Sequence, residues 1–309
     1  MISLQQIHKQ FDSQDKCMAL LVNLRWPDGV SCPRCGNKKV FAVKHRAWNW
    51  VCKSGAETID KQTGEVKICK KQGYRFSPLV GTAFENTNYQ LPIWFEVIYL
   101  ICQSKKGMSA MQVQRMLREN GRPTAYKTAF YICHRVRAML DNPEFGPLMG
   151  QVEVDETCIG GKNRNRHWDK KQPGTGTAGK IPVVGAISRK GNVICKMIEN
   201  ADTETLTKFV RKTVSDKVEL VSTDEHSGYR YLKYAPYPHE VVQHSADEYV
   251  RGNVHTQSID SFWALLKRGI IVTYHNVSKK YLPLYLNEFQ WRFNHRKDSD
   301  IFISALRGC

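Results

Sequence analysis

The sequence lacks an apolar stretch long enough to cross a membrane. Its longest apolar run, residues 91–102, is interrupted by Glu96 and is far shorter than the roughly 20 residues that a spanning helix needs. The N-terminal residues also lack the apolar core of a secretory leader, and most of the 10 cysteines are scattered singly. We therefore expect a protein of the cytoplasm that has no membrane partner.

Acidic residues are scarce relative to basic ones. The chain has 46 Lys plus Arg against 29 Asp plus Glu, for a net charge of +17. Such a surplus favours a polyanionic partner, nucleic acid before membrane, although a basic protein without such a partner is the alternative interpretation. The N-terminal quarter holds a large share of the surplus, so we expect this end to contact phosphate.

A complete pair of Cys-x-x-Cys knuckles is also missing. Cys32-Pro-Arg-Cys35-Gly has the tight spacing of one zinc knuckle, but Cys52 and Cys69, the other nearby thiols, are separated by a stretch that we interpret as an inserted loop. These four thiolates predict one structural Zn²⁺, because no ligand position remains open for catalysis. The alternative is a chance pair at the first knuckle and two buried apolar thiols.

Helical patterns follow the cysteines, over residues 90–103, 109–117 and 126–140. Basic residues on the last one, Arg135 and Arg137, are compatible with a helix-turn-helix, and an ordinary helical hairpin is the open alternative. A Pro/Gly-rich hinge over residues 141–147 then predicts a domain boundary. We expect a helix and zinc ribbon over 1–84, a helical adaptor over 85–146 and a catalytic domain over 147–309.

The last domain alternates strands and helices. The pattern predicts strands at 152–154, 181–188, 192–198 and 218–222, helices at 203–214 and 258–268, and mostly loop over 225–250. This order indicates an α/β fold with a mixed sheet of the RNase-H-like kind. A glycine-rich stretch at 173–180 lacks the Gly-Lys-Ser/Thr of a phosphate loop, which argues against nucleotide binding.

Three aspartates in this domain are candidate metal ligands. Asp155 and Asp224 each follow a predicted strand, so both carboxylates should emerge at strand ends, while Asp260 and Lys267 share one face of a helix. Cutting a phosphodiester needs an activated water and a stabilised leaving oxygen, which two Mg²⁺ ions held by hard oxygen ligands supply. Solvated surface acids are the alternative for any one of them. Candidate DNA-binding cations are Lys162, Arg164, Arg166, Lys170, Lys171 and Arg268.

Three runs carry a family resemblance: Val-Glu-Val-Asp-Glu-Thr-Cys-Ile-Gly-Gly-Lys (152–162), Ser-Thr-Asp-Glu-His-Ser-Gly-Tyr (222–229) and His-Thr-Gln-Ser-Ile-Asp-Ser-Phe-Trp-Ala-Leu-Leu-Lys (255–267). They resemble the D-D-E transposases of bacterial insertion sequences, in particular the ISXO-like group with an N-terminal zinc ribbon, related to Merlin elements. The likeness extends to residues 25–36, 76–85 and 292–296. It implies an RNase-H-like fold, Mg²⁺ or Mn²⁺, the terminal inverted repeats of the element and target DNA as partners, and a homo-oligomer on DNA in the bacterial nucleoid.

Two positions depart from that family. Asp260 stands where the family usually has Glu, so an active enzyme and an inactivated copy are both open. Gln72 stands at the fourth-cysteine position if Cys69 is taken as the third ligand, and we prefer Cys52 for this place. The rival functions are a zinc-ribbon DNA-binding regulator and an RNase-H-type nuclease that cuts without joining.

Overall fold

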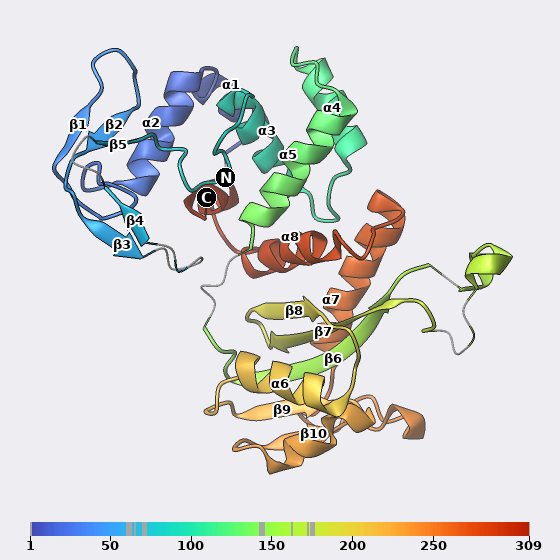
Figure 1. Cartoon of the computed structure of the whole chain (residues 1–309). Coiled ribbons are helices and arrows are strands. Elements are labelled where there is room, and N and C mark those ends of the chain that lie inside the picture. Colours follow the sequence, from blue (N-terminus) through green and yellow to red (C-terminus); the bar gives the residue numbers. More distant parts are fainter. Residues whose placement is uncertain are drawn as a thin grey trace. The chain divides into compact units, whose positions relative to one another are not determined.

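The computed structural model describes residues 2–59, 64, 66–69, 73–141, 146–161, 163–171, 173 and 177–308 (Figure 1). The chain divides into two compact units. Unit 1 comprises Met1–Gln103, Ala110–Met139 and Asp298–Cys309, and unit 2 comprises Ser104–Ser109 and Leu140–Lys297. The C-terminal residues thus belong to unit 1, while the division into three domains stays a prediction. None of the helices among the described residues is both long and apolar enough to span a membrane.

The ribbon of unit 1 is a three-stranded sheet of order β1-β2-β5, from Val40–Ala42, Trp50–Cys52 and Tyr74–Phe76. Its small core holds Trp26, Phe76 and the buried cysteines. The guanidinium of Arg25 donates to the carbonyls of Pro78 and Val80 at 2.7 and 2.6 Å. The segment between Cys52 and Cys69, expected to be a loop, contains an antiparallel pair, β3 (Glu57–Ile59) and β4 (Val66–Ile68).

The helices of unit 1 pack around α3 (Leu91–Gln103), most of whose residues are apolar and buried. Phe95 of α3 contacts Phe302 of the C-terminal helix edge to face, with ring centroids 5.6 Å apart. The buried carboxylate of Glu96 accepts from Arg122 at 2.9 Å and from Asn120 at 2.6 Å. The other helices are α1 (Leu4–Gln10), α2 (Gln14–Arg25), α4 (Ala110–Glu119), α5 (Tyr126–Met139) and α9 (Ile301–Arg307).

Unit 2 contains a five-stranded mixed sheet of order β10-β9-β6-β7-β8. The three strands β6, β7 and β8 form an antiparallel meander, and β9 runs parallel to both β6 and β10. This confirms the predicted mixed α/β sheet of the RNase-H-like kind. The strands are β6 (Gln151–Ile159), β7 (Ile181–Ser188), β8 (Val193–Met197), β9 (Leu220–Thr223) and β10 (His239–Val241).

Helices cover both faces of this sheet. One core lies beneath α6 (Thr203–Thr213) and the 3-10 segment η3 (Ser227–Tyr234), and the other lies beneath α7 (Gln257–Arg268) and α8 (Leu282–Asn294). A π-helical turn, η5 (Gly269–Tyr274), continues α7. Short 3-10 turns are η1 (Asn163–Asn165), η2 (Trp168–Lys170) and η4 (His244–Ala246), and Figure 1 shows the first two on the arm beyond β6 and β7.

Two predicted elements of unit 2 differ from the structure. The strand expected to end at Val154 continues to Ile159, because β7 pairs with it from Val152 to Ile159. We had predicted Asp155 at the end of a strand, and the structure instead places it within β6. Residues 225–250, expected to be mostly loop, contain η3 and β10, since parallel pairing with β9 stabilises three residues that carry little strand signal alone.

Candidate functional site

The acidic side chains of strand β6 lie alternately on the two faces of the sheet. Val154 packs into the core beneath α6, whereas Ile159 packs into the core beneath α7. Because side chains alternate along a strand, Glu153 and Asp155 share the α7 face and Glu156 lies on the α6 face. The hydrogen bonds agree with this alternation, since Asp155 is bound from α7 and Glu156 from η3.

An indole fixes the carboxylate of Asp155. Nε1 of Trp263 on α7 donates to Oδ2 of Asp155 over 2.9 Å. The residue opposite Asp155 on β7 is Gly185, where a Cβ would lie 2.6 Å from the Trp263 ring. The glycine thus provides the space that the indole needs to reach the carboxylate. We did not predict this contact, although a lone glycine inside a strand often marks such a close approach.

Three carboxylates meet where β9 ends. β9 pairs with β6 over only three positions, the last one Ser222 opposite Glu153, so the edge of β6 is open beyond it. Asp224 follows β9 at this open edge. One oxygen each of Asp155, Glu156 and Asp224 can be chosen so that all lie within 4.8 Å of one another. We did not predict Glu156, whose side chain alternates with that of Asp155 along β6.

Two carboxylates of the acidic cluster, Asp155 and Glu156, have raised pKa values. Burial, and then the charges of Glu156, Asp224 and Asp260, raise the pKa of Asp155 to about 8. Burial also raises the pKa of Glu156, while the hydrogen bond of 2.7 Å from the Tyr229 hydroxyl opposes that rise. These causes penalise the ionised form, so a bound cation would stabilise the cluster. Oxygen donors at this spacing fit a hard divalent ion such as Mg²⁺ or Mn²⁺.

Asp260 belongs to the same electrostatic environment but not to the tight oxygen group. It is exposed in the first turn of α7 and accepts a hydrogen bond of 3.2 Å from the hydroxyl of Thr256. Its charge is one of those that raise the pKa of Asp155. Among the described residues, the group of oxygens within 4.8 Å comprises Asp155, Glu156 and Asp224 and leaves Asp260 outside.

The start of α7 is anchored by Glu153, which is 0% exposed. Its Oε2 accepts from the backbone N–H of Ser258 at 2.7 Å and of Ile259 at 3.1 Å. The guanidinium of Arg189 donates to Oε1 at 2.8 Å, and the Nδ1 of His255 lies 3.2 Å from the same oxygen. A carboxylate at a helix N-terminus satisfies amides that have no partner within the helix. The strand that carries Asp155 therefore also holds the helix that carries Asp260.

Lys267 is exposed in the last turn of α7. Burial raises the pKa of Cys158 on β6, and the charges of Lys180 and Lys267 oppose this rise, so both lysines lie near that thiol. At 1.5 Å per residue, Lys267 is about 10 Å along the helix from Asp260. That Lys267 grips a phosphate of the reacting strand stays a prediction.

The other predicted DNA-binding cations of unit 2 differ in their exposure and in their hydrogen bonds. Arg164 and Lys171 are exposed, and so is Arg268. The guanidinium of Arg166 donates to the carbonyl of Gly179 and braces the loop. Lys162 lies outside the described residues, and so does the side chain of Lys170.

Arg135 and Arg137 of α5 differ in exposure. The guanidinium of Arg135 donates to the carbonyl of Ala83 at 3.0 and 2.6 Å and to the Tyr131 hydroxyl at 2.9 Å. Arg137 is only 1% exposed, because the helical period turns position 137 inward while position 135 stays nearer the surface. That either arginine binds DNA stays a prediction.

The four cysteines of the ribbon come together in unit 1. The sulfurs of Cys32 and Cys69 are 3.7 Å apart and those of Cys35 and Cys52 are 3.6 Å apart. All four sulfurs lie within 4.8 Å of one another. A tetrahedral Zn²⁺ with Zn–S bonds of about 2.3 Å requires sulfurs roughly 3.8 Å apart, so the donor set fits zinc. The alternative fourth ligand, Gln72, lies outside the described residues.

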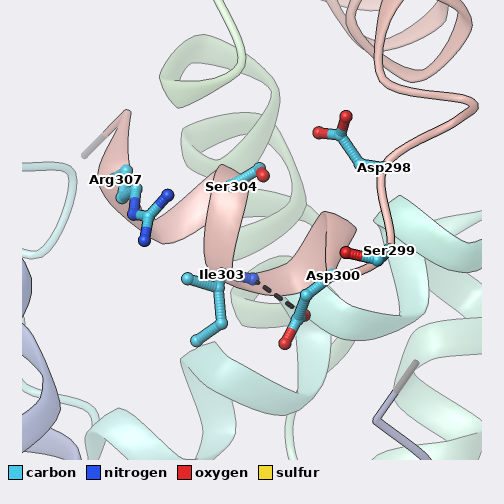
Figure 2. A pocket seen from close by; sticks show the side chains of 6 residues that line it. All are labelled: Asp298, Ser299, Asp300, Ile303, Ser304 and Arg307. Carbon is cyan, nitrogen blue, oxygen red and sulfur yellow. Dashed lines mark hydrogen bonds between the residues drawn. The ribbon is translucent and has the colours of Figure 1, made fainter.

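A separate hollow of about 430 Å³ lies at the start of α9 in unit 1 (Figure 2). Asp300 accepts a hydrogen bond of 3.3 Å from the backbone N–H of Ile303 and so caps this short helix. Ser304 and Arg307 line the same hollow. None of the predicted site residues lines it.

Comparison with known proteins identifies two segments. Residues 147–294 match the ISXO2-like transposase domain, and residues 12–54 match the transposase zinc-ribbon domain. The first segment contains the acidic cluster, Asp260 and Lys267, and the second contains Cys32, Cys35 and Cys52.

One relative is described as an uncharacterized protein in transposable element ISH50 of Halobacterium salinarum. It is 27% identical over 296 residues, which cover 92% of each chain. An uncharacterized transposase-like protein of Haemophilus influenzae is 27% identical over 106 residues, 34% of this chain and 84% of that protein. A chain in the crystal structure of a pre-cleavage Mos1 transpososome aligns at 13% identity with a TM-score of 0.27, over 66% of this chain and 78% of that one.

Proposed function

The chain belongs to the insertion-sequence transposases that combine a zinc ribbon with an ISXO2-like transposase domain, and we propose that it cuts the ends of its element and joins them to target DNA. The observation that carries this proposal is the group of carboxylate oxygens from Asp155, Glu156 and Asp224 at the open edge of β6. Phosphodiester chemistry on DNA needs such hard donors, and the net charge of +17 suits a DNA substrate.

We assign the binding of divalent metal to Asp155, Asp224 and Glu156, with Asp260 completing a second position. Mg²⁺ or Mn²⁺ ions held there would supply Lewis-acid stabilisation of the attacking and leaving oxygens. The indole of Trp263 holds Asp155 in one orientation, and the hydroxyl of Tyr229 does the same for Glu156. Both hydrogen bonds leave one oxygen of each carboxylate for other partners.

The proposed reaction has two displacements at phosphorus. In the first, water attacks at the element end, the bond to the 3′ oxygen breaks, and a free 3′-OH and a 5′-phosphate result. In the second, that 3′-OH attacks a phosphodiester of the target, whose own 3′ oxygen leaves with the proton. One new bond forms and one breaks in each step, so joining needs no external energy source.

We assign recognition of the terminal inverted repeats to the ribbon (1–84) and the helical region (85–146), and chemistry to 147–309. One Zn²⁺ on the four cysteines would hold the ribbon together. The exposed cations Arg164, Lys171 and Arg268 would hold DNA mainly through phosphates. Two ends must be processed together, so we expect a homo-oligomer on DNA, acting at the bacterial nucleoid.

A strand-transfer assay tests the proposal. DNA flanking the gene supplies the paired inverted repeats, and a labelled duplex of one end is incubated with the full chain, Mg²⁺ and a target plasmid. The proposal expects labelled product joined to the plasmid. Nicks without joined product would indicate a nuclease, and binding without any cutting would indicate a DNA-binding regulator.

Asp155→Asn is the matched variant, because it keeps the shape of the side chain and removes its charge. We expect cleavage to fall by about a thousandfold or more while gel-shift affinity for the end stays within about twofold. Asp216→Asn, on a surface turn of the same unit, is the control and should cut normally. Normal cleavage by the Asp155 variant would contradict the assignment.

A further inference from the structure

A cavity of about 470 Å³ in unit 2 is not explained by the carboxylate chemistry. It is formed by the end of β6, the turn η1, the residue before β7, and the end of α7 with the π-helical turn η5. All of these segments belong to the same compact unit. π-helical turns are uncommon and often stand at functional sites, which draws attention to this end of α7.

The cavity combines an apolar lining with a cationic rim. Its apolar side chains are Ile159, Ile270, Ile271 and Val277. Its basic side chains are Arg164, Lys180, Lys267 and His275. No acidic residue is among the described residues that line it. Such a pocket suits a flat apolar group joined to an anion, and a nucleotide has this chemistry.

Two exposed aliphatic side chains stand beside the cavity. Ile271 is 65% exposed and lines the cavity, and its neighbour Val272 is 64% exposed. Because only about a third of each side chain is buried, the fold gains little stability from them. Aliphatic side chains of DNA-binding proteins can enter a base step and take the place of an unstacked base.

The cavity lies at a similar distance from two proposed metal ligands, Asp155 and Asp260, each measured along its own element. Cys158 lines it three residues beyond Asp155, which is about 10 Å at the rise of a strand. Lys267 lines it seven residues beyond Asp260, also about 10 Å at the rise of a helix. One strand of B-DNA rises 3.4 Å per nucleotide, so about three nucleotides span this distance.

We propose that this cavity binds one unpaired nucleotide of the DNA strand that is being processed, about three positions from the reacting phosphate. The base enters the apolar end, Arg164, Lys180 and Lys267 hold its phosphate, and Ile271 fills the place it leaves in the stack. A duplex is too wide to enter a cavity of this volume, so the nucleotide must leave its partner. This inference rests on the proposed function for the identity of the DNA, but its test does not.

Gly161 offers a clean way to close the cavity. It lines the cavity, its backbone is not in the left-handed region, and a Cβ there meets no atom within 4 Å. Gly161→Phe should therefore fill the space without disturbing the fold. Gly146 has the same freedom for a Cβ and does not line the cavity, so Gly146→Phe is the matched control.

The experiment compares two duplexes of one sequence, one fully paired and one with an unpaired 2-aminopurine three nucleotides from its end. We expect the full chain to bind the second duplex about tenfold more tightly and to change the fluorescence of the probe. Gly161→Phe should lose this preference and keep its affinity for the paired duplex, and Gly146→Phe should behave as the unmodified chain does. Equal affinity for the two duplexes, or a preference that survives Gly161→Phe, would overturn the inference.

One further measurement distinguishes a nucleotide within DNA from a free nucleotide as the occupant of the cavity. A second distinguishes failure of the pocket proposal from failure of the proposed function. Millimolar dTMP should not displace the unpaired duplex; displacement would identify a free nucleotide as the occupant and overturn the inference. Strand transfer measured in parallel tests the proposed function on its own. Strand transfer without the preference for the unpaired duplex would overturn the pocket proposal alone. The preference without strand transfer would support the pocket and contradict the proposed function.

Discussion

The carboxylate of Glu153 accepts a hydrogen bond of 2.7 Å from the backbone amide of Ser258, and so ties the strand of Asp155 to the helix of Asp260. The two residues are far apart in the sequence, and each is two positions from a proposed metal ligand. Glu153 contributes no oxygen to the acidic cluster. It is a positioning residue, because it sets where α7 begins relative to β6.

Glu153→Gln should therefore impair chemistry more than binding. The amide keeps the volume, but it loses the charge that pairs with Arg189 and can accept fewer of the four donors around it. We expect cleavage to fall roughly ten- to a hundredfold, as is usual when a supporting partner of a ligand is changed. Gel-shift affinity for DNA should change less than threefold. Glu199→Gln, at an exposed position of the same unit, is the control. Equal losses of binding and cleavage would point to a merely structural role.

The raised pKa of Asp155 predicts how stability depends on pH. Between its usual value of 3.8 and about 8, the folded state holds a proton that the unfolded state releases. Stability from this group is therefore present at low pH and is lost as pH rises toward 8. Without divalent metal, Asp155→Asn should melt progressively higher than the unmodified chain from pH 5 to pH 8. Thermal denaturation at several pH values measures this difference, and a constant difference would contradict it.

Asp260→Glu should restore the reach that the shorter side chain lacks. Asp260 lies outside the group of oxygens within 4.8 Å, and one added methylene extends the side chain by about 1.5 Å. We expect the rate of cleavage to rise severalfold at fixed Mg²⁺ concentration. Asp260→Asn should lower the rate at least about tenfold. A slower Asp260→Glu enzyme would show that the site is built around aspartate.

Zinc content tests the ribbon. Cys52→Ser and Cys69→Ser should each lose the single bound zinc, since each removes one of four thiolates that lie at tetrahedral spacing. The melting temperature of unit 1 should fall by about 5–10 °C. Cys158→Ser in unit 2 is the control and should keep its zinc. Full zinc content in the Cys52 variant would favour a different fourth ligand.

Local sequence patterns predicted most of the elements because they depend on near neighbours. The helix at Leu91–Gln103 and the strand at Ile181–Ser188 follow from apolar runs and their period. Elements that depend on pairing with a distant partner were missed or shortened. β10 carries little signal of its own, and β6 continues through polar residues only because β7 lies beside it.

The sequence by itself determined the mixed α/β class, the zinc-ribbon cysteines and two members of the acidic cluster, Asp155 and Asp224. The tertiary structure alone decided which carboxylates share one point. Glu156 joins Asp155 and Asp224 because β9 stops pairing after Ser222 and opens the sheet edge. Arg137 turns inward because its helix buries that face. Spacing along the chain fixes the order and chemistry of side chains, but strand register and helix rotation fix where they meet, and both depend on contacts between distant residues.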